Sequence, residues 1–249
     1  MKSWLKLFRL EVIKHKRDFL WKVVLLFPLF QTGITFLDFY LRYNFLLQKY
    51  AGKGIADPWL ILLHENHYTA SWYFFLTMGI IVIVGMVDYI EEANGGWKLL
   101  LSLPIRRVHL YLAKGLVSFI MVLIAIIING LGLLAVGKIM GVSSPLPGEA
   151  LLQYIGWQAV AAAGVISIQQ ALFSLRRTML PLILGFGGAV LSPFLLNSGK
   201  EYLVNIIPYS YLYGTLERQV VGFSLPHVLA VSIIVFAAGG VFFSRKDII

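Results

Sequence analysis

Six apolar blocks follow one another along the chain, each close to the ~20 residues that a helix needs to cross a bilayer. Short polar or charged segments separate them. The blocks cover approximately residues 21–40, 70–87, 116–136, 152–175, 179–196 and 225–243. This pattern predicts an all-α integral membrane protein with six transmembrane helices. The even spread of the blocks predicts a single transmembrane domain over residues 1–249.

A basic stretch with helical periodicity precedes the first block. At about 100° per residue, Trp4, Leu5, Phe8 and Val12 share one arc, and several lysines and arginines lie roughly opposite. This predicts an amphipathic interfacial helix over residues 1–19 that lies on the membrane surface. An ordinary basic flank to the first span is the alternative. Because the stretch is long and no small-residue cleavage site follows the block, we expect a retained cytoplasmic segment rather than a signal peptide.

Composition strengthens the membrane interpretation. Of the 249 residues, 59% are hydrophobic and only 13% are charged, about half the share usual in soluble domains. The chain has no cysteine, which excludes disulfides, thiolate metal sites and a thiol nucleophile. The net charge of +9 is carried at the ends of the predicted helices. We therefore expect membrane lipid, rather than nucleic acid, as its partner.

The distribution of lysine and arginine predicts the orientation. Fifteen of these residues fall in segments on the side of the N-terminus, and six fall on the other side. Loops rich in lysine and arginine stay in the cytoplasm. The sequence thus predicts a multi-pass protein of a cell membrane with both termini cytoplasmic.

The chain carries no phosphate-binding loop of the type found in ATPases. Such a loop needs a Gly-Lys pair followed by Ser or Thr. The three Gly-Lys pairs are followed instead by Gly54, Ile139 and Glu201. We therefore expect no cofactor in this chain and no enzymatic activity of its own, and any ATP-driven work requires a separate polypeptide.

A metal site is considered at His64, Glu65, Asn66 and His67. The zinc-protease pattern needs its second histidine four residues after the first, but that position is Tyr68. A weak metal site remains possible by composition. A solvated cluster in a polar loop over residues 41–69 is the favoured interpretation, so no metal is predicted.

Several polar residues interrupt the apolar blocks. Gln31, Thr35 and Asp38 recur on one face of the first span, Asn129 lies in the third, and Gln158 lies in the fourth. Polar side chains at this depth are costly and usually face protein or water. They predict either a partly polar translocation path or hydrogen bonds that hold the helices together. No acid–histidine or serine–base pair stands at a defined spacing within the spans, which disfavours intramembrane catalysis.

The connection between the second and third spans, residues 88–114, has an ordered polar pattern. Asp88, Glu91 and Glu92 lie on one face of a helical turn, and Asn94 to Gly96 break that helix. Residues 97–103 can form a short amphipathic helix, which Pro104 stops. Basic residues then return the chain to the membrane. This layout predicts a structured cytoplasmic feature that could receive another protein.

This connection resembles the coupling-helix signature of type-two ABC exporter permeases. The signature runs from an acid through a glycine, two leucines, a proline and a basic residue to a lysine at the next span. The matching positions here are Glu91, Gly95, Leu100, Leu101, Pro104, Arg107 and Lys114. The basic N-terminal helix, the six spans and an outer hairpin-like segment at 197–224, in which Asn205 to Tyr211 resembles the family pattern, extend the resemblance over most of the chain.

The variant with Asn94, Trp97 and Lys98 looks most like permeases for lantibiotic immunity and peptide export, although the family usually has a small polar residue where Trp97 stands. The resemblance implies a bacterial plasma-membrane permease that forms a homo- or heterodimer. Each copy would dock on a cytoplasmic ABC subunit that binds ATP and Mg. Antimicrobial or amphipathic peptides are the expected substrates. Lipid-linked molecules, drugs, ions, or a non-transport scaffold or sensor role are the alternatives.

The resemblance also implies roles for individual residues of the connection. Glu91 would hold the hinge, Leu99 and its two neighbours would enter the ATPase cleft, and the arginines would fix the segment to lipid or partner. The full set expected to couple the chain to its ATPase is Glu91, Glu92, Gly95, Trp97, Leu99, Leu100, Leu101, Pro104, Arg106 and Arg107.

Overall fold

The computed structural model describes residues 2–93, 96, 105–145, 147–175, 179–197, 205–216 and 224–245. Within these residues six helices are long and apolar enough to span a membrane, which confirms the predicted fold class. They are α2 (Leu20–Ala51), α4 (Trp72–Ala93), α6 (Arg107–Ile139), α7 (Gly148–Phe173), α8 (Met179–Asn197) and α11 (Leu225–Arg245). The shorter helices are α1 (Lys2–Lys14), α3 (Pro58–His64), the π-helix η1 (Glu65–Thr69) and α10 (Tyr209–Tyr213).

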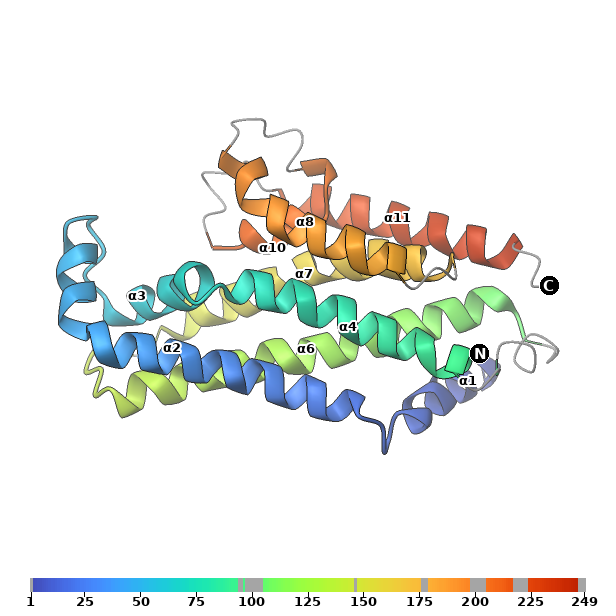
Figure 1. Ribbon diagram of the computed structural model, residues 1–249, viewed down its shortest axis with the longest axis horizontal. Helices are drawn as coiled ribbons and strands as arrows, with labels where there is room; N and C mark the ends of the chain where they lie inside the picture. The colour runs from blue at the N-terminus through green and yellow to red at the C-terminus, as the bar shows by residue number, and fades with distance from the viewer. Residues whose placement is uncertain are drawn as a thin grey trace.

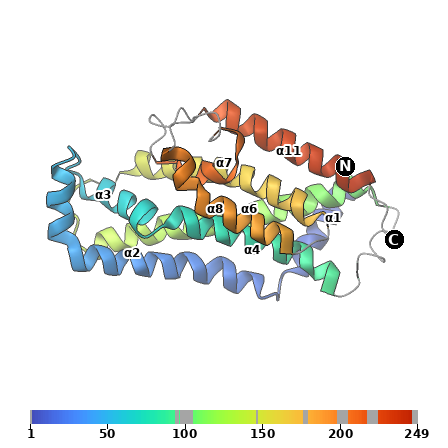
Figure 2. The same ribbon diagram turned by 45° about the horizontal axis from the view of Figure 1, so that its top comes forward.

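The long helices lie side by side along the long axis of the molecule (Figure 1). Helix α7 is central and contacts α4, α6, α8, α10 and α11. Helix α2 packs on α4 and α6. The start of α1 and the end of α11 (Leu225–Arg245) lie at the same end of the bundle, whereas α3 lies at the opposite end (Figures 1 and 2). We call these the terminal end and the far end.

The first span is longer than predicted, and the predicted polar loop over residues 41–69 is wrong. Helix α2 has 32 residues, about 48 Å at 1.5 Å per residue, because apolar residues such as Phe45 and Leu46 continue the helix and neither glycine nor proline occurs between Tyr40 and Gly52. Helix α3 then begins at Pro58, where the side chain of Asp57 accepts a hydrogen bond from the backbone N–H of Trp59. Most of the expected loop is therefore helical.

Helix α1 packs on α6 at the terminal end. Leu7 is buried, and the partly buried rings of Trp4 and Phe8 stack with centroids 6.0 Å apart. Leu5 remains 55% exposed, and Val12 is also exposed. The predicted apolar arc is thus divided between the bundle and the surroundings. The placement of α1 on a membrane surface stays a prediction.

Close packing fixes α3 at the far end. A Cβ atom added at Gly137 of α6 would overlap the ring of Trp59, so the ring lies directly against the glycine backbone. The Trp59 Nε1–H donates to the carbonyl of Ser144, and the Ser144 hydroxyl donates to Asp57. The loop after α6 and the start of α3 therefore hold each other in place.

Part of the expected outer segment at 197–224 lies among the described residues. Pro208 directly precedes α10, which packs on α8 and α7. The hydroxyl of Tyr211 donates to the carbonyl of Asn205 over 2.6 Å. This part of the chain is therefore a short helix packed against the bundle, and its assignment as a hairpin-like unit stays a prediction.

Candidate functional site

At the terminal end, two lysines converge on the carboxylate of Glu91 near the end of α4. Lys114 Nζ of α6 lies 2.5 Å from Glu91 Oε2, and Lys14 Nζ of α1 lies 2.9 Å from Glu91 Oε1. Glu91 is only 3% exposed. The Glu91 side chain therefore joins three helices at one point.

Two further carboxylates complete this group, which we call the Glu91 ion-pair cluster. Glu11 accepts from Lys14 over 2.5 Å within α1, and Asp88 lies 3.9 Å from Lys114. Lys114 also donates to the carbonyl of Val87 over 2.7 Å. Buried charges are tolerated only when they are paired and hydrogen-bonded, so the five side chains depend on one another.

The electrostatics of Lys14 follow from its carboxylate partners. Burial alone would lower the pKa of Lys14, but hydrogen bonds and charge attraction to Glu11 and Glu91 raise it above its ordinary value. Lys14 therefore stays protonated and holds α1 against the end of α4. Only Glu91 of this cluster belonged to the predicted coupling set. Asp88 and Lys114 stood in the predicted connection, whereas the two residues of α1 were missed. Their available signal was Glu11, the single acidic residue among residues 1–17.

Most of the predicted coupling segment lies outside the described residues. This applies to Gly95, Trp97, Leu99, Leu100, Leu101 and Pro104, and of Glu92 only the backbone is described. Arg106 is exposed immediately before α6, and Arg107, at its first position, is partly buried. The roles assigned to these residues stay predictions, but the Glu91 ion-pair cluster stands where the chain enters and leaves the segment.

The residues predicted for a translocation path fall into separate groups. Thr35 donates to Asn66 Oδ1 over 3.0 Å, and Asn66 donates to Asn129 over 3.2 Å. Gln31 instead donates to the carbonyl of Ala70. These four side chains are buried and bridge α2, η1 and α6. Their contacts are hydrogen bonds that join helices to one another. A role of these residues in substrate passage stays a prediction.

The other two predicted path residues lie apart from this group. Gln158 of α7 is buried and accepts from Trp72 Nε1–H of α4 over 3.1 Å. The side chain of Asp38 is 21% exposed and pairs with Arg42, one turn along α2. Asp38 is thus the member of the predicted set that forms an ion pair and reaches the surface.

The expected solvated cluster at His64 to His67 is wrong, because Glu65, Asn66 and His67 are fully buried. The chain turns back into the bundle through η1, so these side chains reach the interior from the far end. The His67 ring lies 3.0 Å from both the Tyr154 hydroxyl and the Tyr213 carbonyl. Together with Glu65 and Asn66 these contacts form what we call the Glu65–His67 cluster.

The two hydrogen-bond partners of the His67 ring determine which of its nitrogens carries the proton. A carbonyl can only accept, so Nε2 carries the proton toward Tyr213, and Nδ1 accepts from the Tyr154 hydroxyl. Burial lowers the pKa of His67 to about 4, so the ring is neutral at pH 7. Both ring nitrogens are occupied by protein groups. Among the described residues no group of three potential metal ligands occurs.

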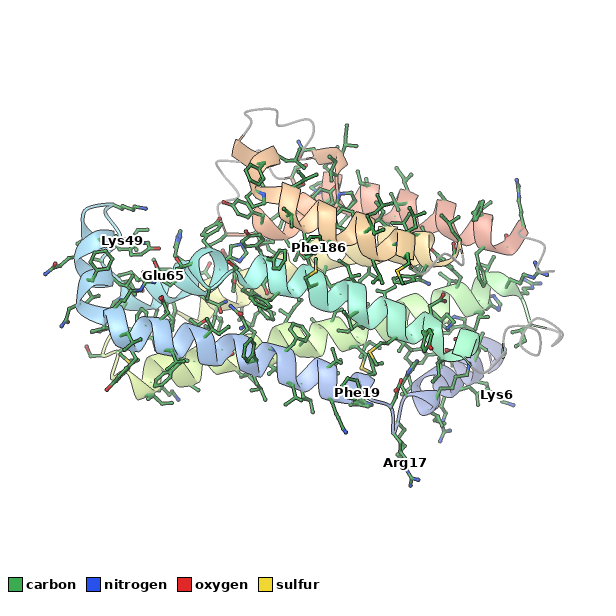
Figure 3. The ribbon with its side chains drawn as sticks, viewed as in Figure 1. Lys6, Arg17, Phe19, Lys49, Glu65 and Phe186 are labelled. Carbon is green, nitrogen blue, oxygen red and sulfur yellow. The ribbon has the colours of Figure 1, made fainter. Side chains whose placement is uncertain are left out.

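Glu65 is held by charges and hydroxyls at the far end (Figure 3). Its carboxylate lies 3.1 Å from Arg42 and 3.3 Å from Lys49, and accepts from the Tyr50 hydroxyl over 2.8 Å. Burial alone would raise the pKa of Glu65, but hydrogen bonds from Thr69 and Tyr50 and the charge of Lys49 lower it. Glu65 is therefore ionised and multiply anchored.

Comparison with protein families gives one match over most of the chain. A family model described as "ABC-2 family transporter protein" matches residues 7–192. Comparison with curated proteins and with solved structures gave no match. The matched range contains η1, the Glu91 ion-pair cluster and the connection that resembles a coupling helix.

Proposed function

The chain belongs to the ABC-2 family of transporter proteins, and on that premise we propose that it exports amphipathic peptides, driven by an ATPase that docks at residues 91–104. Membership makes it a multi-pass permease subunit of an ABC transporter, which works with a separate ATP-binding subunit and is not itself the ATPase. The docking segment, the peptide substrate and the dimer of two permease copies belong to the proposal, as do the bacterial plasma membrane and the cytoplasmic termini.

The observation that carries the proposal is the Glu91 ion-pair cluster. A segment that transmits force must be anchored to rigid elements at its base. Glu91 lies two residues before the last residue of α4, and Lys114 lies in the third turn of α6. Their ion pair closes the base of the proposed coupling segment, and Lys14 extends the anchor to α1.

The first test separates docking from coupling. Replacing Leu99, Leu100 and Leu101 with alanine removes apolar area worth roughly 1.5–3 kcal/mol per side chain, so co-purification of the ATP-binding subunit should be lost. Lys14→Met should keep the partner but lower export per ATP hydrolysed, because α1 is released. Lys16→Met, at an exposed position of the same basic stretch, is the matched control. Normal docking and export by the triple variant would overturn the coupling role.

The second test concerns the substrate. Cells that produce this chain and its ATP-binding subunit should tolerate amphipathic peptide antibiotics better than cells whose partner ATPase is inactivated. Asp38→Asn should lower this protection at normal protein yield if Asp38 contacts the substrate. Protection against non-peptide drugs alone would replace the peptide assignment and leave the coupling role intact.

A further inference from the structure

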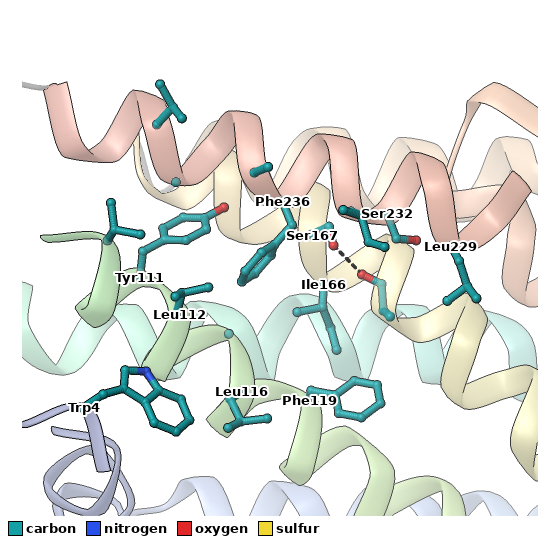
Figure 4. Close-up of a pocket in the computed structure, with 17 residues that line it drawn as sticks. Trp4, Tyr111, Leu112, Leu116, Phe119, Ile166, Ser167, Leu229, Ser232 and Phe236 are labelled. Carbon is teal, nitrogen blue, oxygen red and sulfur yellow. Dashed lines mark hydrogen bonds between the residues drawn. The ribbon is translucent and has the colours of Figure 1, made fainter. Parts of the chain in front are cut away.

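An apolar groove of about 680 Å³ lies between α1, α6, α7 and α11 at the terminal half of the bundle (Figure 4). Its volume is in the range of small-molecule sites, and apolar side chains form most of its wall. Phe119, Ile166 and Leu229 lie toward one end of it, and Tyr111 and Trp4 lie toward the other (Figure 4). The part away from α1 is mostly apolar but includes the hydroxyls of Ser167 and Ser232, and the Tyr111 hydroxyl and Trp4 Nε1–H belong to the end near α1.

Those polar atoms differ in their hydrogen bonding. The hydroxyls of Ser167 and Ser232 donate to carbonyls of their own helices over 2.7 and 2.6 Å. The Tyr111 hydroxyl and the Trp4 Nε1–H are buried and have no hydrogen-bond partner in the described part of the chain. Buried donors normally have an acceptor. The groove therefore offers two donors, both near its end at α1, to an occupant that carries acceptor oxygens.

A cation stands beyond the same end. A second hollow of about 470 Å³ shares Val241 with the groove and is lined by Arg245, one turn further along α11. Arg245 is exposed. From the surface inward the order of groups is therefore a guanidinium, two hydrogen-bond donors and an apolar trough.

A phospholipid has the complementary order of groups: a phosphate, ester carbonyls and acyl chains. We propose that the groove binds an acyl chain of a phospholipid from the leaflet at the terminal end. The phosphate lies at Arg245 and an ester carbonyl accepts from Tyr111 or Trp4. A helix of a second copy would also fill the trough, and its backbone carbonyls can accept second hydrogen bonds, but only a phospholipid places a phosphate at Arg245 beside its ester carbonyls and acyl chain. The proposal requires neither the peptide substrate nor the ATPase.

The test uses the full-length chain in phosphatidylcholine bilayer discs that contain a trace of the same lipid with a photoreactive group at mid-chain. Adducts should map to peptides of α6 and α11 that line the groove. Ala237→Trp fills the groove from an exposed position, and excluding two methylene groups should reduce these adducts by about tenfold. Ile234→Trp, which introduces the same side chain at an exposed position one turn away and outside the groove, should leave them unchanged.

Two further measurements identify the occupant. Tyr111→Phe should weaken the binding of ester-linked lipid several-fold and leave the binding of its ether-linked analogue unaffected. Arg245→Gln should weaken the binding of both lipids. Equal adduct yields from Ala237→Trp and the unaltered chain would mean ordinary surrounding lipid and would overturn the proposal. Because the chain lacks cysteine, Ile233→Cys tests for a second copy. Rapid disulfide dimers without lipid adducts would show that a second copy fills the groove.

Discussion

The two ends of the bundle each bury one glutamate between two cations, but they do so differently. At the terminal end, Glu91 depends on Lys14 and Lys114, and the side chain of Lys114 is itself only 5% exposed. At the far end, the side chains of Arg42 and Lys49 are about one-third exposed, and Tyr50 adds a neutral hydrogen bond. At the far end both cations therefore have access to solvent, whereas at the terminal end the side chain of Lys14 is 31% exposed but that of Lys114 is buried.

This difference indicates that the terminal end is the more sensitive of the two to the loss of a single charge. Removing Glu91 leaves the buried Lys114 without its nearest carboxylate. At the far end Arg42, Lys49 and the Tyr50 hydroxyl share Glu65, and both cations reach solvent. The following predictions test this contrast.

The largest effect is expected for Glu91→Gln. It leaves the buried ammonium group of Lys114 without its nearest carboxylate, while Lys14 keeps Glu11, and this should cost about 3–5 kcal/mol of unfolding free energy. Glu65→Gln should cost clearly less, because Arg42 and Lys49 reach solvent. Thermal unfolding of both variants in the same detergent measures the difference. Equal losses would contradict the contrast between the two ends.

A pH dependence is expected next, from His67. Its pKa is lowered to about 4 in the folded protein from 6.5, so the unfolded chain binds the proton first as the pH falls. Stability should be full above pH 6.5 and should decline toward pH 4 by at most about 3 kcal/mol. Glu65, with a lowered pKa, adds a further loss only below its ordinary value of 4.5.

Thermal unfolding at pH 7 and pH 5 tests this assignment. His67→Gln should be less stable at pH 7 but should show a smaller difference between the two pH values. His227→Gln, at an exposed position near the start of α11, should retain the dependence of the unaltered chain. An unchanged dependence in His67→Gln would assign the effect to another group.

A smaller effect tests the packing of the far end. Gly137→Ala places a methyl group against the Trp59 ring and should cost about 1–3 kcal/mol. Gly156→Ala, where no atom lies within 4 Å of the added methyl, should be neutral or stabilising by up to about 1 kcal/mol. Unfolding midpoints of the two variants provide the comparison, and a stable Gly137→Ala variant would mean that α3 is loosely held.

The smallest effect is expected for Lys49→Met. The side chain is 35% exposed, and Glu65 retains Arg42 and Tyr50, so the loss should be at most about 1 kcal/mol. Lys114→Met should cost several times more because its ammonium group is buried against Glu91. If the two substitutions lowered the free energy of unfolding equally, burial would not determine how much these ion pairs contribute to stability.

The sequence was sufficient for the spans and the family, but not for the interior contacts. Each apolar block has the length and hydrophobicity of a membrane-spanning helix, so six helices could be predicted from hydrophobicity alone. The burial of Glu65 to His67 could not be predicted in this way, because a polar run predicts an exposed loop. Only the structure shows that the chain turns back into the bundle through η1. The pair Lys14–Glu91 joins residues 77 positions apart, and nothing in either local pattern specifies the other.

The length of α2 has a mechanical consequence. Lys22 and Arg42 are separated along it by about 30 Å, which equals the thickness of the hydrocarbon core of a bilayer. The two cations therefore set the depth at which α2 lies in a bilayer with one cation at each boundary. A thicker or thinner membrane imposes hydrophobic mismatch, relieved by tilt or by local deformation of the lipid at fractions of a kcal/mol per ångström. Because residues 15–19 join α1 to α2 and Lys14 ties α1 to Glu91, we expect a change in bilayer thickness to shift this ion pair relative to the hydrocarbon boundary.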